Sequence, residues 1–165
     1  MNDIVIIAGF PGVGKSTCTK LLEKEKSCID FESTNYKWIK DNDGHSHINP
    51  LWPANYVKAI KMLKYETYGL QEYKNLKYIF ISTHKEALSM LKKEGETFII
   101  VAPLNKDTAI KRYIARGSSD EFIENIDNNF DTYMKDLYSY GMDIIVSDKY
   151  LSNLLPDISI YKEKS

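Results

Sequence analysis

A short segment near the N-terminus combines glycines, a lysine and hydroxyl side chains at the spacing of a phosphate-binding loop. The segment is Gly9-Phe10-Pro11-Gly12-Val13-Gly14-Lys15-Ser16-Thr17, and it matches the pattern G-x-x-x-x-G-K-[ST] at every fixed position. Glycines permit a loop whose successive N–H groups turn inward toward phosphate oxygens. Lys15 is spaced to reach the β- and γ-phosphates of a nucleoside triphosphate, and the Ser16 hydroxyl to coordinate Mg²⁺. We therefore expect every residue of this segment except Phe10 to contribute to binding ATP or a close relative.

The two arginines of the chain, Arg112 and Arg116, lie four residues apart, whereas all other basic residues are lysines. On a helix predicted over 105–116 they are neighbours on one side. The apolar residues of this helix gather on the opposite side and are Ile110, Tyr113 and Ile114. Guanidinium groups suit planar, bidentate phosphate contacts, so we expect both arginines to neutralise charge on a transferred phosphoryl group. The alternative is a solvated helix end whose arginines interact with the helix dipole.

Two carboxylates, Asp30 and Glu32, stand near the end of a strand predicted over 27–33 and point to the same side. A carboxylate there can orient a substrate, bind Mg²⁺ through water, or accept a proton from an attacking hydroxyl. Asp30 is the candidate base if the acceptor is a hydroxyl, whereas an anionic phosphate acceptor needs no base. The alternative is that the strand end has simply reached solvent.

A second group of candidates concerns the acceptor molecule. His84 and Lys85 lie in the first turn of a helix that Thr83 and Glu86 are expected to open as a capping box. Together with the free N–H groups of that turn they offer a site for an anion, although an exposed first turn explains them equally. Lys37 is a further candidate for contact with an acceptor phosphate.

Metal binding is expected mainly at Ser16. Ser82 occupies the strand end where related phosphate-binding folds often carry an aspartate for Mg²⁺. His45 and His47 beside Asp43 offer possible ligands as well, but an H-x-H pair without a recognised third ligand is not a sufficient pattern for a metal site.

These candidates follow predicted strands, so the elements that position them can be read from the same sequence. The expected strands cover 4–8, 27–33, 78–82, 97–102 and 143–147. The expected helices cover 16–26, 53–68, 83–94, 105–116 and 120–140, and a short tail follows the last strand. Strands that alternate with helices predict a parallel sheet, and ligands of such sheets bind beyond the carboxyl ends of the strands. The fold class expected is α/β, a three-layer P-loop NTPase fold with a five-stranded parallel sheet flanked by helices.

Composition limits the remaining function classes. The 165 residues are 43% hydrophobic and 27% charged, which suits one globular domain. The net charge of −1 speaks against duplex nucleic acid as the main partner. No segment resembles a signal peptide or the roughly 20 apolar residues of a membrane helix, and Cys18 and Cys28 suit a reducing compartment. We expect a cytoplasmic protein without membrane contact, either a monomer or a homodimer.

The extended loop with Pro11 and Thr17 resembles that of adenylate-kinase-like and shikimate-kinase-like enzymes, which carry a G-x-P-G-x-G-K pattern. Residues 82–86 and 112–117 resemble small phage-type deoxynucleoside monophosphate kinases. The resemblance implies one kinase domain over 1–165, an acceptor-binding insertion over about 34–73 and a short lid over about 112–120. The arginine that adenylate-kinase-like enzymes place near the acceptor phosphate has no counterpart here.

The sequence therefore predicts an ATP- and Mg²⁺-dependent phosphotransferase whose partner is a small-molecule nucleotide, first a (deoxy)nucleoside monophosphate. One alternative is a kinase of a hydroxyl acceptor, such as a nucleoside, a small metabolite or a polynucleotide 5′ end, with Asp30 as base. Another alternative is a nucleotide-binding regulatory module with little turnover.

Overall fold

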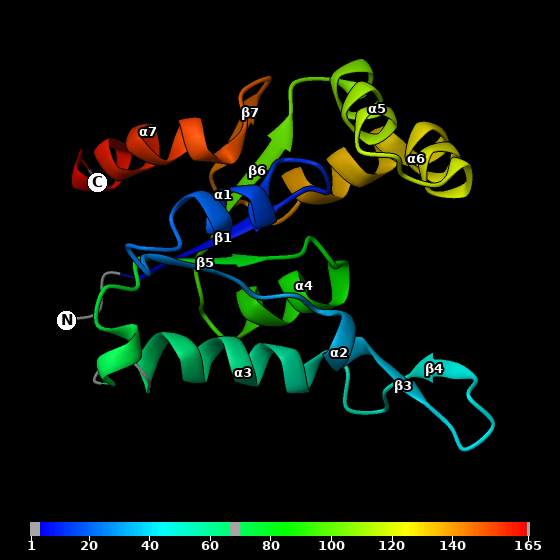
Figure 1. Ribbon diagram of the computed structural model, residues 1–165, viewed down its shortest axis with the longest axis horizontal. Coiled ribbons are helices and arrows are strands. Elements are labelled where there is room, and N and C mark those ends of the chain that lie inside the picture. The colour runs from blue at the N-terminus through cyan, green and yellow to red at the C-terminus, as the bar shows by residue number, and fades with distance from the viewer. Residues whose placement is uncertain (1–3, 67–69, 165) are drawn as a thin grey trace.

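A parallel β-sheet forms the centre of the molecule (Figure 1). The computed structural model describes residues 4–66 and 70–164. The strands are β1 (Val5–Gly9), β2 (Cys28–Asp30), β5 (Tyr78–Ile81), β6 (Ile99–Pro103) and β7 (Ile144–Ser147). They pair in the order β2-β5-β1-β6-β7, and every pairing is parallel. The predicted five-stranded parallel sheet is thus confirmed.

Helices cover the sheet on both sides. They are α1 (Lys15–Leu21), α3 (Ala54–Tyr65), α4 (Lys85–Lys93), α5 (Lys106–Ala115), α6 (Asp120–Tyr138) and α7 (Leu151–Lys164). In Figure 1, α3 and α4 lie together on one side of β1 and β5, while α1 and α7 lie together on the other. The predicted three-layer arrangement is confirmed. Among the described residues, no helix combines the length and the hydrophobicity that a membrane crossing requires.

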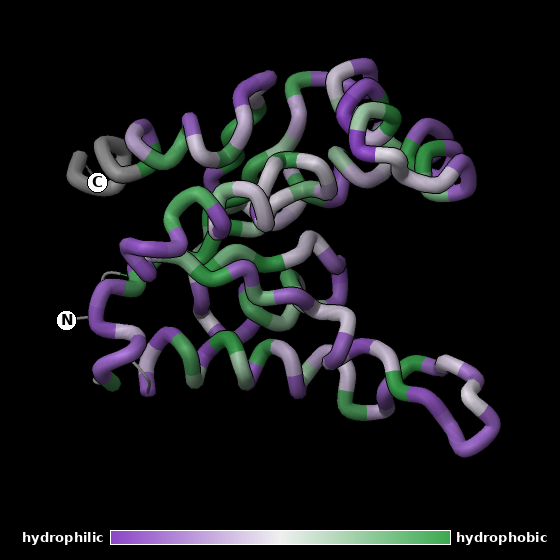
Figure 2. Tube along the Cα trace, viewed as in Figure 1, coloured by the Kyte–Doolittle hydropathy of each residue, from purple (hydrophilic) through white to green (hydrophobic). Residues whose placement is uncertain are grey.

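The core sits between these layers. Every residue of β1, β5 and β6 is buried, as expected for strands with helices on both faces. Figure 2 shows the hydrophobic residues gathered along these strands and the hydrophilic ones on the outer surfaces of the helices. Full burial of one such aliphatic side chain stabilises the fold by about 1.5–3 kcal/mol. The strands therefore provide a rigid base whose carboxyl ends carry the candidate residues.

The chain beyond β7 forms helix α7, so the prediction of a short tail is wrong. Its buried residues recur at the spacing of one helix face and are Leu151, Leu154, Leu155 and Ile158. Such a stripe favours a helix packed on the core, and α7 packs against α1. Pro156 lies inside the helix although proline removes one backbone donor there. Burial of the apolar stripe outweighs that loss.

Residues 34–52, for which the sequence predicts no strand or helix, contain ordered elements. A short helix α2 (Thr34–Lys37) leads into an antiparallel hairpin of β3 (Trp38–Lys40) and β4 (Ser46–Ile48). Both strands are exposed along their length, and the hairpin projects from the body of the molecule (Figure 1). A 3₁₀ turn, η1 (Gln71–Tyr73), precedes β5. Helix α3 ends at Tyr65, and its predicted end at residue 68 lies outside the described residues.

The start of α4 differs from the expected capping box. His84, with an extended backbone, is the N-cap, and no side chain caps the helix. Thr83 therefore precedes the cap by one residue, which is one position too early for its hydroxyl to serve as the N-cap side chain. The capping box of Thr83 and Glu86 was wrong for this reason, although the helix ends before Gly95 as predicted.

Candidate active site

A cavity of about 1280 Å³ opens at the carboxyl ends of the strands. Its walls come from the glycine-rich loop after β1, the ends of β2 and β5, helices α5 and α6, and the segment after β7. Strand β1 lies between β5 and β6, with β2 beyond β5 and β7 beyond β6. The strand order therefore reverses direction at β1. Open parallel sheets bind ligands at this kind of position.

The glycine-rich loop has the backbone that its sequence predicts. Gly12 and Gly14 adopt φ angles of +88° and +97°, which L side chains rarely adopt. A Cβ atom at Gly12 would lie 2.8 Å from Cε1 of Tyr113, so this position also requires a small residue for packing. Gly14 is the N-cap of α1, and the first N–H groups of that helix have no partner within it. The loop therefore offers backbone donors and a helix start to an anion.

Lys15 lies folded against this loop. Its Nζ atom donates to the carbonyl oxygen of Gly9 at 2.9 Å. Burial lowers the pKa of Lys15, and the nearby carboxylates of Asp30 and Glu32 oppose that effect. A partly desolvated ammonium with one weak acceptor is well suited to exchange that acceptor for phosphate oxygens.

The first turn of α1 contributes the hydroxyl groups of Ser16 and Thr17. Both residues are exposed and line the cavity next to Lys15. A hydroxyl at this place fits the ligand chemistry of Mg²⁺, which prefers oxygen ligands and retains several waters. Ser16 and Asp30 are the candidate-site residues that could hold the ion, and both line the same cavity.

The two arginines reach the cavity in different ways. Arg112 donates from Nη1 to the Gly12 carbonyl oxygen at 3.3 Å and from Nη2 to the Asp148 carbonyl oxygen. Its guanidinium also lies 4.2 Å from the ring centroid of Tyr150. Arg116 is exposed, and its Nε donates to Ser118 Oγ at 2.8 Å. Arg112 thus joins the loop to the segment after β7. Among the described residues, the Arg116 guanidinium donates only to Ser118 Oγ, so a phosphate group has one hydrogen bond to displace there.

The predicted apolar face of α5 is partly wrong. Tyr113 is fully buried and Ile110 packs against the core, but Ile114 is 64% exposed. Tyr113 faces the glycine-rich loop, where its hydroxyl donates to the Pro11 carbonyl oxygen at 2.7 Å. The helix therefore packs on the loop itself rather than only on the core. Residues 116–119 connect α5 to α6, and their function as a lid stays a prediction.

Asp30 occupies an unusual environment at the end of β2. Its Oδ1 atom is buried and has no hydrogen-bond partner within the described part of the chain. Burial raises the pKa of Asp30, Glu32 raises it further, and Lys15 opposes both. Glu32 is exposed, and both carboxylates line the cavity. A carboxyl group with a raised pKa and an unpaired oxygen can accept a proton in this position.

The remaining candidates surround the same cavity. His84 contacts the Trp52 ring edge-on with centroids 5.3 Å apart, and burial lowers the pKa of His84, so its imidazole is neutral near pH 7. Lys37 holds its Nζ 5.7 Å from the Trp52 centroid. Lys85 is exposed and lies 3.8 Å from Asp136. The structure thus brings Lys37, His84 and Lys85 to one cavity, where an acceptor role remains a prediction.

Sequence reasoning missed a hydrogen-bonded group between β2 and β5. The Tyr56 hydroxyl donates to the Phe31 carbonyl oxygen at 2.5 Å and accepts from the Ser82 N–H at 3.5 Å. Ser33 Oγ donates to Ser82 Oγ at 3.2 Å. Tyr56 is fully buried and stacks on the ring of Phe31. Its sequence signal is one aromatic residue among many, so only the fold could single it out.

The charges that line the cavity are unevenly distributed. The cations are Lys15, Lys37, Lys85, Arg112 and Arg116, and the carboxylates are Asp30, Glu32, Glu86 and Asp136. Lys15 and the two arginines belong to the glycine-rich loop and α5. The carboxylates belong to the ends of β2, the start of α4 and α6. We call the part of the cavity formed by the glycine-rich loop and α5 the donor end, and the part formed by β2, α2, α4 and α6 the acceptor end. The acceptor end contributes more carboxylates than cations, although Asp30 and Glu32 are near enough to Lys15 to affect its pKa.

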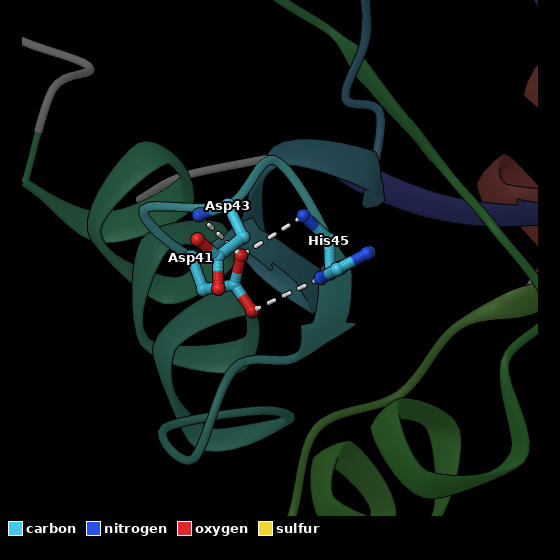
Figure 3. A group of neighbouring side chains, drawn as sticks. All are labelled: Asp41, Asp43 and His45. Atoms are coloured by element: carbon cyan, nitrogen blue, oxygen red, sulfur yellow. Dashed lines mark hydrogen bonds and ion pairs between the residues drawn. The ribbon is translucent and has the colours of Figure 1, made fainter.

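The loop that contains His45 and His47 does not bring both histidines into one group of possible metal ligands among the described residues. Asp41, Asp43 and His45 come together there (Figure 3). His47 lies on β4 and does not belong to this group. Asp41 Oδ1 accepts from the N–H groups of Asp43 at 3.0 Å and His45 at 2.9 Å. All three residues are exposed. Closure of the hairpin turn by the Asp41 side chain explains this cluster.

Comparison with known proteins supports the fold. No protein-family model matches the chain, and no curated protein matches its sequence significantly. A solved structure, the tunicamycin resistance protein of Deinococcus radiodurans, is similar with a TM-score of 0.58 and 13% sequence identity, over 98% of this chain and 95% of that chain. At this identity the likeness concerns the fold alone. Together with the sheet order and the glycine-rich loop, it confirms the predicted P-loop NTPase-like fold.

Proposed function

We propose that this protein transfers the γ-phosphoryl group of ATP to a hydroxyl group of a small acceptor, and that Asp30 accepts the hydroxyl proton. The observation that carries this proposal is Asp30, which lines the cavity and whose buried Oδ1 atom has no hydrogen-bond partner among the described residues. A buried polar atom without a partner destabilises the fold. An acceptor hydroxyl that donates to this oxygen removes that cost while it places its own oxygen in the cavity.

The donor end of the cavity supplies the binding of ATP. The loop amides and Lys15 hold the β- and γ-phosphates, and Lys15 exchanges the Gly9 carbonyl for phosphate oxygens. Arg112 keeps the loop against the segment after β7, and the exposed Arg116 approaches the transferred group. When bound through the Ser16 hydroxyl, Mg²⁺ supplies positive charge to the phosphates.

The reaction has a simple balance. The acceptor oxygen forms a bond to the γ-phosphorus, the bond to the β–γ bridging oxygen breaks, and ADP leaves. The proton of the hydroxyl passes to the Asp30 carboxylate and is later lost to water. Because Asp30 has a raised pKa, it is a stronger base than an ordinary aspartate when ionised. Catalysis otherwise depends on positioning and on fixed positive charge.

A nucleoside monophosphate remains the second candidate acceptor. Lys37, Lys85 and the start of α4 line the cavity and favour it, as does the resemblance of the loop. Two observations favour a hydroxyl acceptor instead. The acceptor end contains Asp30, Glu32 and further carboxylates, and its Lys85 is already near Asp136. A dianionic phosphate placed beside Asp30 and Glu32 would be repelled by both carboxylates.

The proposal is tested by ADP release in a coupled assay with matched pairs of acceptors. Each pair contains a hydroxyl compound and its phosphate ester, for example a nucleoside and its 5′-monophosphate. We expect turnover with hydroxyl compounds and a loss of about 10²–10⁴-fold in Asp30→Asn. The matched control is Asp43→Asn, which removes an exposed carboxylate of the hairpin turn and leaves the rate within about twofold.

Three outcomes decide between the candidates. If monophosphates are phosphorylated and the Asp30→Asn variant retains this turnover, the acceptor is a nucleoside monophosphate and Asp30 is not a general base. ATP binding without turnover on any acceptor would indicate a nucleotide-binding regulatory module. Unchanged ATP affinity in Lys15→Ala would overturn both kinase proposals, because every version requires this lysine at the phosphates.

A further inference from the structure

Two fully buried tyrosines contact the two ends of the cavity in the same manner. Tyr113 and Tyr56 are each 0% exposed, and each donates its hydroxyl to a backbone carbonyl oxygen. Buried tyrosine hydroxyls normally find a partner, so a hydrogen bond alone implies no function. What distinguishes this pair is the location of the carbonyls. Both belong to segments that form the walls of the cavity.

Tyr113 supports the donor end. Its hydroxyl bonds the Pro11 carbonyl oxygen at 2.7 Å, and its ring occupies the space that a Cβ at Gly12 would need. Tyr113 therefore contacts two consecutive residues of the phosphate-binding loop, Pro11 and Gly12. The Arg116 guanidinium also lies over this ring, 4.9 Å from its centroid. Loop and arginine thus share one rigid support.

Tyr56 supports the acceptor end. Its hydroxyl bonds the Phe31 carbonyl oxygen, which lies between Asp30 and Glu32 in the chain, and accepts from the Ser82 N–H. It thereby joins the ends of β2 and β5 at the edge of the cavity. Its ring stacks on Phe31 with centroids 5.4 Å apart and planes 10° apart. The Phe31 N–H also donates to the Phe80 carbonyl oxygen at 2.8 Å, so the backbone that carries Asp30 is held on both sides of Phe31.

We propose that Tyr113 and Tyr56 are positioning residues, Tyr113 for the loop that holds ATP and Tyr56 for the strand end that presents Asp30 to the acceptor. This proposal rests on the proposed function. It predicts that the Tyr113 hydroxyl affects the binding of ATP and that the Tyr56 hydroxyl affects the reaction of the acceptor. Burial raises the pKa of both tyrosines, so each remains a hydrogen-bond donor throughout the physiological range. Each residue acts through the backbone and needs no contact with a substrate.

The experiment uses Tyr113→Phe and Tyr56→Phe, which keep the stacked rings and remove one oxygen each. We expect Tyr113→Phe to raise the KM and the dissociation constant of ATP about three- to tenfold, with kcat at saturating ATP within about twofold. Tyr56→Phe leaves ATP affinity within about twofold and lowers kcat/KM for the acceptor about three- to tenfold. The control is Tyr65→Phe on the same helix as Tyr56. The Tyr65 hydroxyl bonds Glu96 away from the cavity, so both constants should stay within about twofold.

The pH profile separates positioning from general stability. If Tyr56→Phe loosens the Asp30 segment toward water, the pKa of Asp30 falls toward its ordinary value. The acidic limb of the acceptor kcat/KM profile then moves to lower pH in Tyr56→Phe and stays in place in Tyr113→Phe. Thermal unfolding confirms that both variants are folded at the assay temperature.

The outcomes are distinguishable from those of the proposed function. The positioning roles would be overturned if both variants lost ATP affinity and acceptor kcat/KM equally, or if neither variant changed. Turnover by the wild-type protein would leave the kinase proposal intact in that case. If the unchanged protein shows no transfer to any acceptor, the proposed function and the Tyr56 role fail together. The ATP dissociation constant, measured without acceptor, still decides the role of Tyr113 in that case.

Discussion

The two ends of the cavity are built in opposite ways. The donor end is made largely of backbone from one continuous segment, residues 9–17, which leaves a buried strand and enters α1. The acceptor end is made of side chains from β2, α2, α4 and α6, which lie far apart in the sequence. A site made of consecutive backbone groups leaves a motif in the sequence, whereas a site made of dispersed side chains leaves single residues. The comparison explains why phosphate binding is easy to recognise here and acceptor identity is not.

The largest expected effect separates the two arginines of the donor end. Arg116→Ala should lower kcat about 10³-fold or more, because a guanidinium at the transferred phosphoryl group acts on the transition state. Arg112→Ala should instead raise the KM of ATP about tenfold, since Arg112 is bonded to the carbonyls of Gly12 and Asp148. Steady-state kinetics with varied ATP measures both. Equal loss of kcat in the two variants would contradict this division.

A second prediction tests whether the donor end depends on backbone shape. Gly12→Ala combines a φ of +88° with a Cβ 2.8 Å from Tyr113, so it should destabilise the fold by about 2–3 kcal/mol and weaken ATP binding at least tenfold. Gly44→Ala is the matched control. Gly44 has a φ of +82° and no atom within 4 Å of its Cβ position, so it should cost only about 1–2 kcal/mol and leave ATP affinity unchanged. Urea unfolding and nucleotide titration provide the two readouts.

The same contrast decides how much could be predicted from the sequence. Residues 4–17 predict a buried strand, a loop and the start of a helix. Because these three predictions are adjacent in the sequence, each makes the other two more specific. Tyr56 and Tyr113 could not be identified, because an aromatic residue on a helix is more often a core residue. Their hydroxyl partners lie 25 and 102 residues away. Non-local partners of this kind have no local pattern.

Two errors have physical causes. The apolar stripe of α7 is present in the sequence, but the helix is stabilised by packing against α1, a contact between the two ends of the chain that no local pattern indicates. The hairpin of β3 and β4 was hidden because its strands have three residues each and both are exposed. Exposed short strands lack the alternation of buried and exposed residues that normally indicates a strand.

A third prediction concerns the unpaired carboxyl group of the acceptor end. Because the pKa of Asp30 is raised in the folded protein, the folded state holds its proton more tightly than the unfolded state does. Its contribution to stability is therefore lost as pH rises from the ordinary aspartate pKa through the raised value, and above both the ionised group opposes folding. Asp30→Asn should raise the melting temperature at pH 8 and raise it less at pH 4. A lower melting temperature at pH 8 would mean that Lys15 stabilises the ionised carboxylate more than burial opposes it.

The smallest expected effect discriminates between the candidate acceptors. Lys85 is 70% exposed and lies 3.8 Å from Asp136, so this ion pair contributes about 0–1 kcal/mol to stability. Lys85→Gln should change the KM of a hydroxyl acceptor by less than about twofold, since a neutral ligand gains little from a solvated ammonium. Lys93→Gln, exposed at the other end of α4, is the matched control and should behave identically. If Lys85→Gln instead raises the KM of a monophosphate about tenfold while Lys93→Gln does not, the lysine binds the acceptor phosphate. The excess of carboxylates at this end would then be compensated by Lys85 at the moment of binding, and the donor and acceptor ends would both be sites for anions.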